Sequence, residues 1–247
     1  MWESISSKKS RSFVERHLDP KDKDTSGISA RPAITISRLE GAGGLTVASN
    51  LSNYLETHTP SREEWTVFSQ HLVGKVLEEH RLDNRVADFM KEDHKGLLTD
   101  AFEEFLGLHP STWTLVQRTN ATILRLAQIG NVILVGRGAN VVTSGLENVF
   151  HVHLVGSFEK RVEQAQKVFS LDRKSAISYI KKKDAARKRY LKDNFDKDIN
   201  DPLLYHIIIN TDLVRHDEAA RLIGNEVIAR FKLDNTMKAT EKRARPS

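Results

Sequence analysis

The sequence predicts an α/β protein built around a parallel β-sheet. Short runs of β-branched and aliphatic residues alternate along the chain with longer segments of helical spacing, as in consecutive βαβ units. The run Ala33–Ser37 leads directly into a glycine-rich turn, and the run Val132–Val135 leads into Gly136-Arg137-Gly138. Because 247 residues with 39% hydrophobic content can fill a sizeable core, one compact domain is the simplest organisation.

Five runs are predicted as strands, with helices between them. The strands are 33–37, 65–68, 132–135, 150–155 and 205–210, and 65–68 is the least marked of the five. The predicted helices are 46–56, 70–80, 84–93, 98–107, 112–129, 157–168, 175–190 and 218–231. Gly130 provides a C-cap for one of these helices and Ser157 an N-cap for another.

The two ends of the chain differ in composition from its middle. Residues 1–30 are rich in Ser, Lys and Asp, which predicts a flexible arm or a loosely attached helix. Residues 233–247 are similarly polar and are predicted to form a flexible tail. Between them, residues 31–232 contain no repeat and no long linker, and are predicted to be one domain.

The composition excludes several classes of protein. The chain has no cysteine, so disulfides and thiolate metal sites are excluded. No apolar run approaches the ~20 residues of a membrane span, and no apolar segment follows the basic N-terminus as in a secretory signal. A cytoplasmic protein is therefore expected. The net charge of +5 suits anionic partners, although ordinary protein surfaces carry a similar excess.

The turn from Ser37 to Thr46 (SRLEGAGGLT) joins the first strand to a helix and predicts a phosphate-binding loop. Such a turn can direct several backbone N–H groups at one anion, and glycines allow the phosphate oxygens to approach closely. The hydroxyl of Thr46 suits Mg²⁺. The candidate binding residues are Gly41, Ala42, Gly43, Gly44, Leu45 and Thr46. The alternative is an ordinary glycine-rich β–α turn, because Gly44 occupies the position of the lysine in a Walker loop.

Several segments together resemble a known family. ITISRLEGAGGLTVASNL, GRGANVV at 136–142, FHVHLVGSFEKRVE at 150–163, DAARKRY at 184–190 and YHIIINTD at 205–212 resemble, in the same order, the cytidylate-kinase-like family. The resemblance covers most of residues 33–230. It implies a three-layer P-loop NTPase fold with a helical acceptor-side insertion at about 70–129 and a helical lid at about 170–198. It also implies ATP with Mg²⁺ as donor and a nucleoside monophosphate as acceptor.

Arginines are the expected partners of a transferring phosphoryl group, because a planar guanidinium binds phosphate bidentately and stays charged. Arg137 follows a buried strand and is expected to emerge at the carboxyl edge of the sheet, where ligands bind. The resemblance implies that it holds the acceptor phosphate, and the alternative is an exposed turn arginine. In the family this stretch reads Asp-Gly-Arg-Asp, whereas Val135 and Gly138 replace both acids here. The first loop residue with a charge, Arg38, is predicted to contact the β- and γ-phosphates in place of the missing lysine.

The basic segment 175–190 is predicted to be the lid helix. Asp184 and Arg187 are three residues apart and share a helix face, as in the family's D-x-x-R lid pattern. Arg187 is therefore the first candidate for contact with the transition state, followed by Arg161 and Arg189. The lysines at 181–183 are interpreted as a solvated face.

Three further features have two interpretations each. Phe68 is a candidate for stacking on an acceptor base, or else a core residue. Asp212 lies where the family binds adenine, but it also suits the start of the last helix. His151 and His153 share a strand face without nearby carboxylates at ligand spacing, which argues against a zinc site.

The leading functional hypothesis is ATP-dependent phosphoryl transfer to a small acceptor, most simply CMP or dCMP. The alternative is a nucleotide-binding regulatory protein with a kinase fold and weak or no catalysis, which the missing lysine and acids favour. Nucleic-acid binding is not expected, because no aromatic residues interleave with the lysines of the basic helix. Neither a membrane partner nor a larger assembly than a homodimer is expected.

Overall fold

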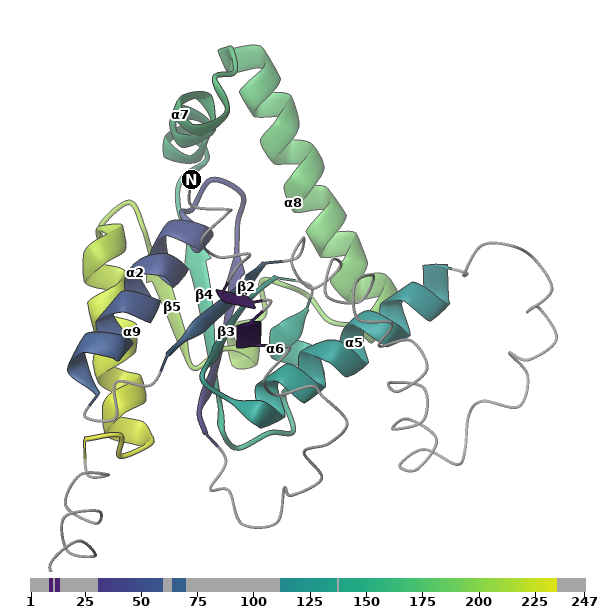
Figure 1. Cartoon of the computed structure of the whole chain (residues 1–247). Coiled ribbons are helices and arrows are strands. Elements are labelled where there is room, and N and C mark those ends of the chain that lie inside the picture. Colours follow the sequence, from purple (N-terminus) through teal and green to yellow (C-terminus); the bar gives the residue numbers. More distant parts are fainter. Residues whose placement is uncertain are drawn as a thin grey trace, which may run out of the picture.

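The computed structural model describes residues 9–10, 12–13, 31–59, 64–69, 112–136 and 138–234. Within this part of the chain lies a five-stranded, all-parallel sheet with the strand order β2-β3-β1-β4-β5 (Figure 1). The strands are β1 (Ala33–Arg38), β2 (Thr66–Ser69), β3 (Val132–Val135), β4 (Val149–Val155) and β5 (Ile207–Asn210). The prediction of an α/β fold with a five-stranded parallel sheet is confirmed.

The helices cover both faces of this sheet, so the fold has three layers (Figure 1). Helices α2 and α9 lie together on one face, and α5 and α6 lie on the other. The long helix α8 packs against α7 and passes the carboxyl ends of the strands. The bounds are α2 Gly44–His58, α5 Thr112–Ile129, α6 Ala139–Val142, α7 Phe158–Phe169, α8 Arg173–Phe195 and α9 His216–Arg230, with a 3₁₀ turn at Pro202–Leu204.

The central strand β1 divides the core because its side chains alternate between the two faces. Ile34 and Ile36 are fully buried in the cluster beneath α2 and α9. Ala33, on the opposite face, belongs to the cluster beneath α5. Thr35 and Ser37 share that second face, so the sheet presents buried hydroxyl groups there beside its apolar residues.

Local capping explains where several helices begin and end. The hydroxyl of Ser157 accepts a hydrogen bond from Lys160 N and caps α7, and Gly130 takes a left-handed conformation after α5, as predicted for both. Helix α8 begins at Arg173, two residues before its predicted start, because Asp172 Oδ1 accepts from Ser175 N at 2.7 Å. Helix α9 begins at His216 rather than at Glu218.

Part of the N-terminal segment packs against the domain. Phe13 is buried, and its ring makes an edge contact with Phe68 at a centroid distance of 5.7 Å. Lys9 Nζ lies 3.2 Å from Glu56 Oε1. The rest of the arm predicted at 1–30, the helices predicted between 70 and 107, and the tail from 235 lie outside the described residues.

Candidate phosphate-binding and acceptor site

The glycine-rich turn links the carboxyl end of β1 to α2, and its shape depends on two glycines. Gly41 and Gly43 have φ angles of 84° and 78°, in the left-handed region that favours glycine. A Cβ atom at Gly41 would lie 2.6 Å from the carbonyl oxygen of Arg161, and one at Gly43 would lie 2.2 Å from Nε2 of His216. The turn is therefore compact and closely enclosed by α7 and α9.

The first turn of α2 offers N–H groups to an anion. Because α2 begins at Gly44, the N–H groups of Gly44, Leu45 and Thr46 have no intrahelical acceptor. The first turn contains no acidic residue, and the helix dipole adds partial positive charge. Leu45 and Thr46 are exposed, whereas Ala42 is buried and its N–H donates to Leu39 O at 3.2 Å. The later residues of the turn thus form the open part of the cradle.

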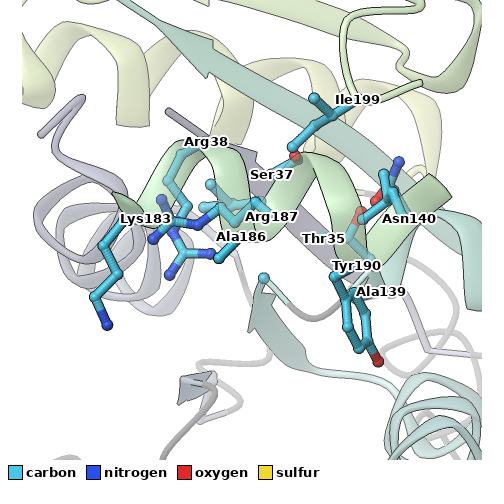
Figure 2. Close-up of a pocket in the computed structure, with 14 residues that line it drawn as sticks. Thr35, Ser37, Arg38, Ala139, Asn140, Lys183, Ala186, Arg187, Tyr190 and Ile199 are labelled. Atoms are coloured by element: carbon cyan, nitrogen blue, oxygen red, sulfur yellow. The ribbon is translucent and has the colours of Figure 1, made fainter. Parts of the chain in front are cut away.

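A cavity of about 270 Å³ adjoins this turn and lies between β1, α6 and α8 (Figure 2). Three cationic side chains line it, namely Arg38, Lys183 and Arg187. The remaining lining residues are Thr35, Ile36, Ser37, Gly136, Gly138, Ala139, Asn140, Ala186, Tyr190, Leu191 and Ile199. No carboxylate lines the cavity among the described residues, so the cavity favours an anionic ligand.

Arg38 connects the turn with the cavity. A Cβ atom at Gly44 would lie 3.0 Å from Cγ of Arg38, and one at Gly136 would lie 2.2 Å from its Nη1. The side chain therefore passes the start of α2 and ends beside the turn after β3. This position is compatible with contact to an anion at the start of α2.

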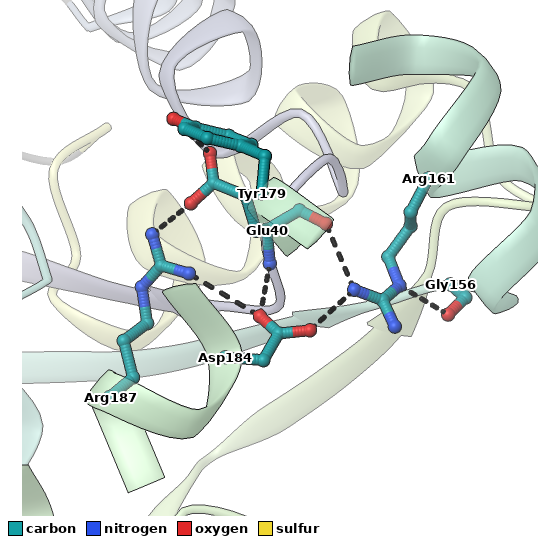
Figure 3. A network of polar contacts seen from close by, with 6 residues as sticks. All are labelled: Glu40, Gly156, Arg161, Tyr179, Asp184 and Arg187. Carbon is teal, nitrogen blue, oxygen red and sulfur yellow. Dashed lines mark hydrogen bonds and ion pairs between the residues drawn. The ribbon is translucent and has the colours of Figure 1, made fainter. Parts of the chain in front are cut away.

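Arg187 meets two carboxylates at the turn (Figure 3). Its Nη2 pairs with Glu40 Oε2, and its Nη1 lies 3.4 Å from Asp184 Oδ1. Asp184 Oδ1 also accepts a hydrogen bond from the backbone N–H of Glu40 at 2.8 Å. Helix α8 is thus fastened to the glycine-rich turn through Glu40, a residue that the sequence analysis did not identify.

Arg161 is enclosed by the same network. Its Nη1 donates to Asp184 Oδ2 at 2.6 Å and to Glu40 O at 3.0 Å, and its Nε donates to Gly156 O at 3.0 Å. The residue is only 8% exposed. Its position beside the turn indicates that it supports the loop, whereas the sequence nominated it for contact with the transition state.

Three other predicted site residues do not line the cavity among the described residues. Arg189 is exposed on α8 and lines neither this cavity nor the one described below. Phe68 has no exposed surface and packs in the core against Phe13, so its ring is not open to a base and the structure supports the core interpretation. Arg137 lies outside the described residues, although its neighbours Gly136 and Gly138 line the cavity.

Lys183 was interpreted from the sequence as part of a solvated face, but it lines the cavity. The signal that would have found it is its helical spacing, because positions 183, 187 and 190 share one face of α8. Lys181 and Lys182, by contrast, are exposed.

A second cavity, of about 190 Å³, lies on the other side of the turn. Its lining residues are Gly41, Lys160, Arg161, Glu163, Gln164, Lys167, Thr211, Asp212 and His216. Asp212 Oδ2 accepts a hydrogen bond from Ser157 N at 2.9 Å. A hydrogen bond from the Ser157 hydroxyl, and after it this backbone bond, lowers the Asp212 pKa. Asp212 therefore supports the start of α7 and does not begin α9, whose N-cap is Arg215, so its interpretation as the start of the last helix is wrong.

Buried histidines lie beneath the first cavity. His151 Nδ1 is 2.9 Å from the Thr35 hydroxyl, and His153 stacks on Tyr205 with a centroid distance of 4.6 Å. Burial lowers the pKa of each histidine from 6.5 to about 4. Both are therefore neutral at pH 7, and this part of the protein carries no charge beneath the cavity.

The fold and the site together define an α/β protein of the P-loop kinase type. A family model for the cytidylate kinase-like family matches residues 33–213, which is more than half of the chain. The protein belongs to this family. No curated protein matches the chain significantly.

Solved structures resemble the fold at low sequence identity. A crystal structure of an uncharacterised protein from Eubacterium ventriosum has a TM-score of 0.58 and 21% identity, covering 80% of this chain and 98% of that one. Shikimate kinase from Acinetobacter baumannii in complex with shikimate has a TM-score of 0.41 and 16% identity, covering 82% and 96% of the two chains. TT1252 from Thermus thermophilus has a TM-score of 0.41 and 14% identity, covering 81% and 97%.

Among the described residues, no helix has the length and apolar character to cross a membrane. Nor do the described residues contain a group of three His, Asp or Glu side chains placed to hold a metal ion.

Proposed function

We propose that the protein transfers a phosphoryl group from ATP to a nucleoside monophosphate, with CMP or dCMP as the first candidates. The observation that supports this most is the adjacency of two anion sites. The open N–H groups at the start of α2 lie beside a cavity lined by Arg38, Lys183 and Arg187. Two phosphorylated ligands bound in these places would bring their phosphates together, and positioning of this kind is the main requirement of phosphoryl transfer.

Each side of the turn receives one substrate in this proposal. The loop N–H groups hold the donor phosphates, and the second cavity beside Gly41, Thr211 and His216 takes the rest of the donor. Arg38 supplies the charge that a Walker lysine would supply. The first cavity takes the acceptor, and Arg187 stabilises the charge that develops on the moving group.

Mg²⁺ fits this arrangement as an ion held mainly by substrate. Thr46 presents an exposed hydroxyl oxygen at the start of α2, where donor phosphates would lie. Mg²⁺ commonly binds through one or two protein oxygens, substrate phosphates and water. The carboxylates of Glu40, in the turn, and of Asp184, on α8, are already paired with arginines, so Thr46 is the residue we assign to the ion. Bound Mg²⁺ would neutralise phosphate charge.

A regulatory protein that binds nucleotide without transferring phosphate is the second candidate. The specific observation in its favour is the pairing of Arg187 with Glu40 and Asp184, because this arginine is already engaged by two carboxylates. Gly44 also occupies the position of the lysine in a Walker loop, and the loss of that charge favours a regulatory protein over a kinase.

One experiment separates the two functions. Production of ADP from Mg-ATP is measured with each nucleoside monophosphate in turn, and ATP binding is measured by calorimetry on the same preparation. ADP production that depends on CMP or dCMP supports the kinase, while ATP binding without transfer supports the regulatory protein. The variant Arg38→Ala is expected to weaken ATP binding at least tenfold through loss of a charge-assisted contact. The exposed Arg189→Ala is its control, and unchanged affinity in Arg38→Ala would remove Arg38 from the mechanism.

A further inference from the structure

The outer side of helix α8 carries a long row of positive charges. Lys183, Arg187 and Tyr190 line the cavity on the inner side of this helix, and the opposite side faces away from the sheet (Figure 1). Positions three, four and seven residues apart share one face of an α-helix, and eight exposed residues follow this spacing on the outer side. The outer row consists of Lys174, Ser178, Lys181, Lys182, Ala185, Lys188, Arg189 and Lys192. Six of its members are cations and none is an acid.

The positive charge of the whole chain is concentrated on this one helix. Helix α8 contains nine lysine and arginine residues and two aspartates, a net charge of +7, whereas the complete chain has a net charge of +5. Of the two aspartates, Asp184 pairs with Arg161 and Arg187 on the inner side, and Asp193 follows the end of the outer row. The acids of α8 therefore do not interrupt the outer row.

A row of like charges is unfavourable for a helix that faces only water. Lys188 and Lys192 are four residues apart, a spacing at which two cations destabilise a helix, whereas solvated helices commonly place an acid opposite each lysine at this distance. A polyanion laid along the row would neutralise neighbouring cations together and so remove their repulsion. The charge pattern of the outer row is thus complementary to a chain of anions.

The length of the row indicates what kind of polyanion fits it. From Lys174 to Lys192 the helix rises by about 27 Å. A nucleic-acid duplex rises by about 3.4 Å per base pair, so the row is as long as about eight base pairs. Six cations spread over this distance match a line of phosphates, whereas a single small anion would contact only a few of them.

Two other polyanions fit the outer row less well than a duplex does. Binding of an unpaired strand normally uses aromatic side chains that stack on bases, and the outer row has none. An anionic membrane is flat and favours helices with exposed apolar side chains, which the row also lacks. The adjacent helix α7 exposes Glu159 and Glu163, and a flat anionic surface that covered both helices would meet these carboxylates. A duplex is a narrow rod and can be held through its phosphates alone.

We propose that the outer row of α8 binds the phosphate backbone of a nucleic-acid duplex without reading its sequence. This inference does not depend on phosphoryl transfer, because Lys183 and Arg187 line the cavity from the opposite side of the helix. Helix α8 thus presents one cationic side to a small ligand and the other to a polyanion.

The test uses fluorescence anisotropy of a labelled DNA duplex of about 20 base pairs, which exceeds the length of the row. Binding to the full chain is measured at a series of KCl concentrations. The variant Lys182→Gln/Lys188→Gln removes two charges from the outer row. Lys192 is left unchanged because it pairs with Asp196. The matched control Arg221→Gln/Lys232→Gln removes two exposed cations from α9 and the residues after it.

The wild type should bind the duplex with a Kd of about 1–10 μM at low salt, and the slope of log affinity against log salt should be about −5 for six phosphate contacts. The outer-row variant should bind about tenfold more weakly at the same salt and lower the magnitude of the slope by about 2, because it loses two of these contacts. The control should stay within about twofold of the wild type. All three proteins should have the same melting temperature within about 2 °C, since every substituted position is exposed.

Three results would overturn the proposal. If the wild type does not bind the duplex at low salt, the outer row is only a solvated face. If both variants lose the same affinity, binding follows the net charge of the protein and not the row on α8. Vesicles of phosphatidylserine and phosphatidylcholine are the second probe, and binding to these vesicles without binding to the duplex would identify a membrane as the partner instead.

Discussion

Arg187 of helix α8 forms an ion pair with Glu40 of the glycine-rich turn, and both side chains are largely buried at 17% and 16% exposure. Tyr179 adds a long hydrogen bond of 3.5 Å to the other oxygen of Glu40. In the proposed reaction Arg187 contacts a phosphoryl group, so it must exchange a carboxylate for a phosphate. Glu40 then acts as an internal competitor of the substrate phosphates.

The variant Glu40→Gln tests this competition. Removal of one negative charge beside the phosphate loop, and of one partner of Arg187, should tighten ATP binding about fivefold, since an incompletely buried pair contributes about 1 kcal/mol. Calorimetry with ATP checks the change, and Glu159→Gln, which breaks an exposed pair with Arg173, is the control. Weaker ATP binding in Glu40→Gln would instead show that Glu40 holds Arg187 ready for substrate.

Arg161 is predicted to contribute to stability more than to catalysis. Its side chain is 9% exposed, and its guanidinium donates hydrogen bonds to Asp184 and to the backbone carbonyl oxygens of Glu40 and Gly156. The variant Arg161→Met leaves Asp184 short of a cation, and breaking a buried pair in this way costs about 3 kcal/mol. Urea unfolding measures the change.

Arg173→Met serves as the control for that measurement, because the pair of Arg173 with Glu159 is exposed and contributes less than about 1 kcal/mol. If the two variants lose the same stability, the supporting role of Arg161 is wrong. A loss of ATP turnover without loss of stability would return Arg161 to the set of transition-state contacts.

The parts of the fold that follow from local patterns could be predicted from the sequence. Strands such as Val132–Val135 are continuous apolar runs, as expected when both faces of a parallel sheet are covered. The glycine-rich turn is recognisable because left-handed backbone at Gly41 and Gly43 requires glycine. Helix caps such as Ser157 are also local signals.

The missed features depend on tertiary packing. Glu40 is one acidic residue in a loop until α8 places Arg187 against it. Asp212 was interpreted as a helix start, yet its carboxylate bonds with Ser157, which is 55 residues away in the sequence. No spacing rule connects such distant residues.

The conformation of Gly43 gives a prediction with a matched control. Gly43→Ala places a Cβ 2.2 Å from the His216 ring at a φ of 78°, so either the turn or His216 must move. We expect a loss of about 1–3 kcal/mol in the free energy of unfolding, together with a large loss of ATP affinity. Gly145→Ala has nothing within 4 Å of its Cβ and should change stability by less than about 0.5 kcal/mol. Equal effects at the two positions would contradict this account of the turn.

The buried histidines predict that the protein loses stability in mild acid. Burial lowers the pKa of His151 and of His153 from 6.5 to about 4 in the fold. The unfolded chain therefore binds protons at a higher pH than the folded chain does, and stability falls as the pH decreases from about 6.5 to about 4. A shift of this size corresponds to about 3 kcal/mol for each histidine.

The variant His153→Gln isolates one of these contributions. It lacks the titrating ring, so its free energy of unfolding should depend less steeply on pH between 7 and 4, whatever its stability at pH 7. Urea unfolding at a series of pH values measures the slope, and His58→Gln, at an exposed position on α2, should keep the slope of the wild type. If His153→Gln also keeps that slope, then burial does not hold His153 neutral in the folded protein.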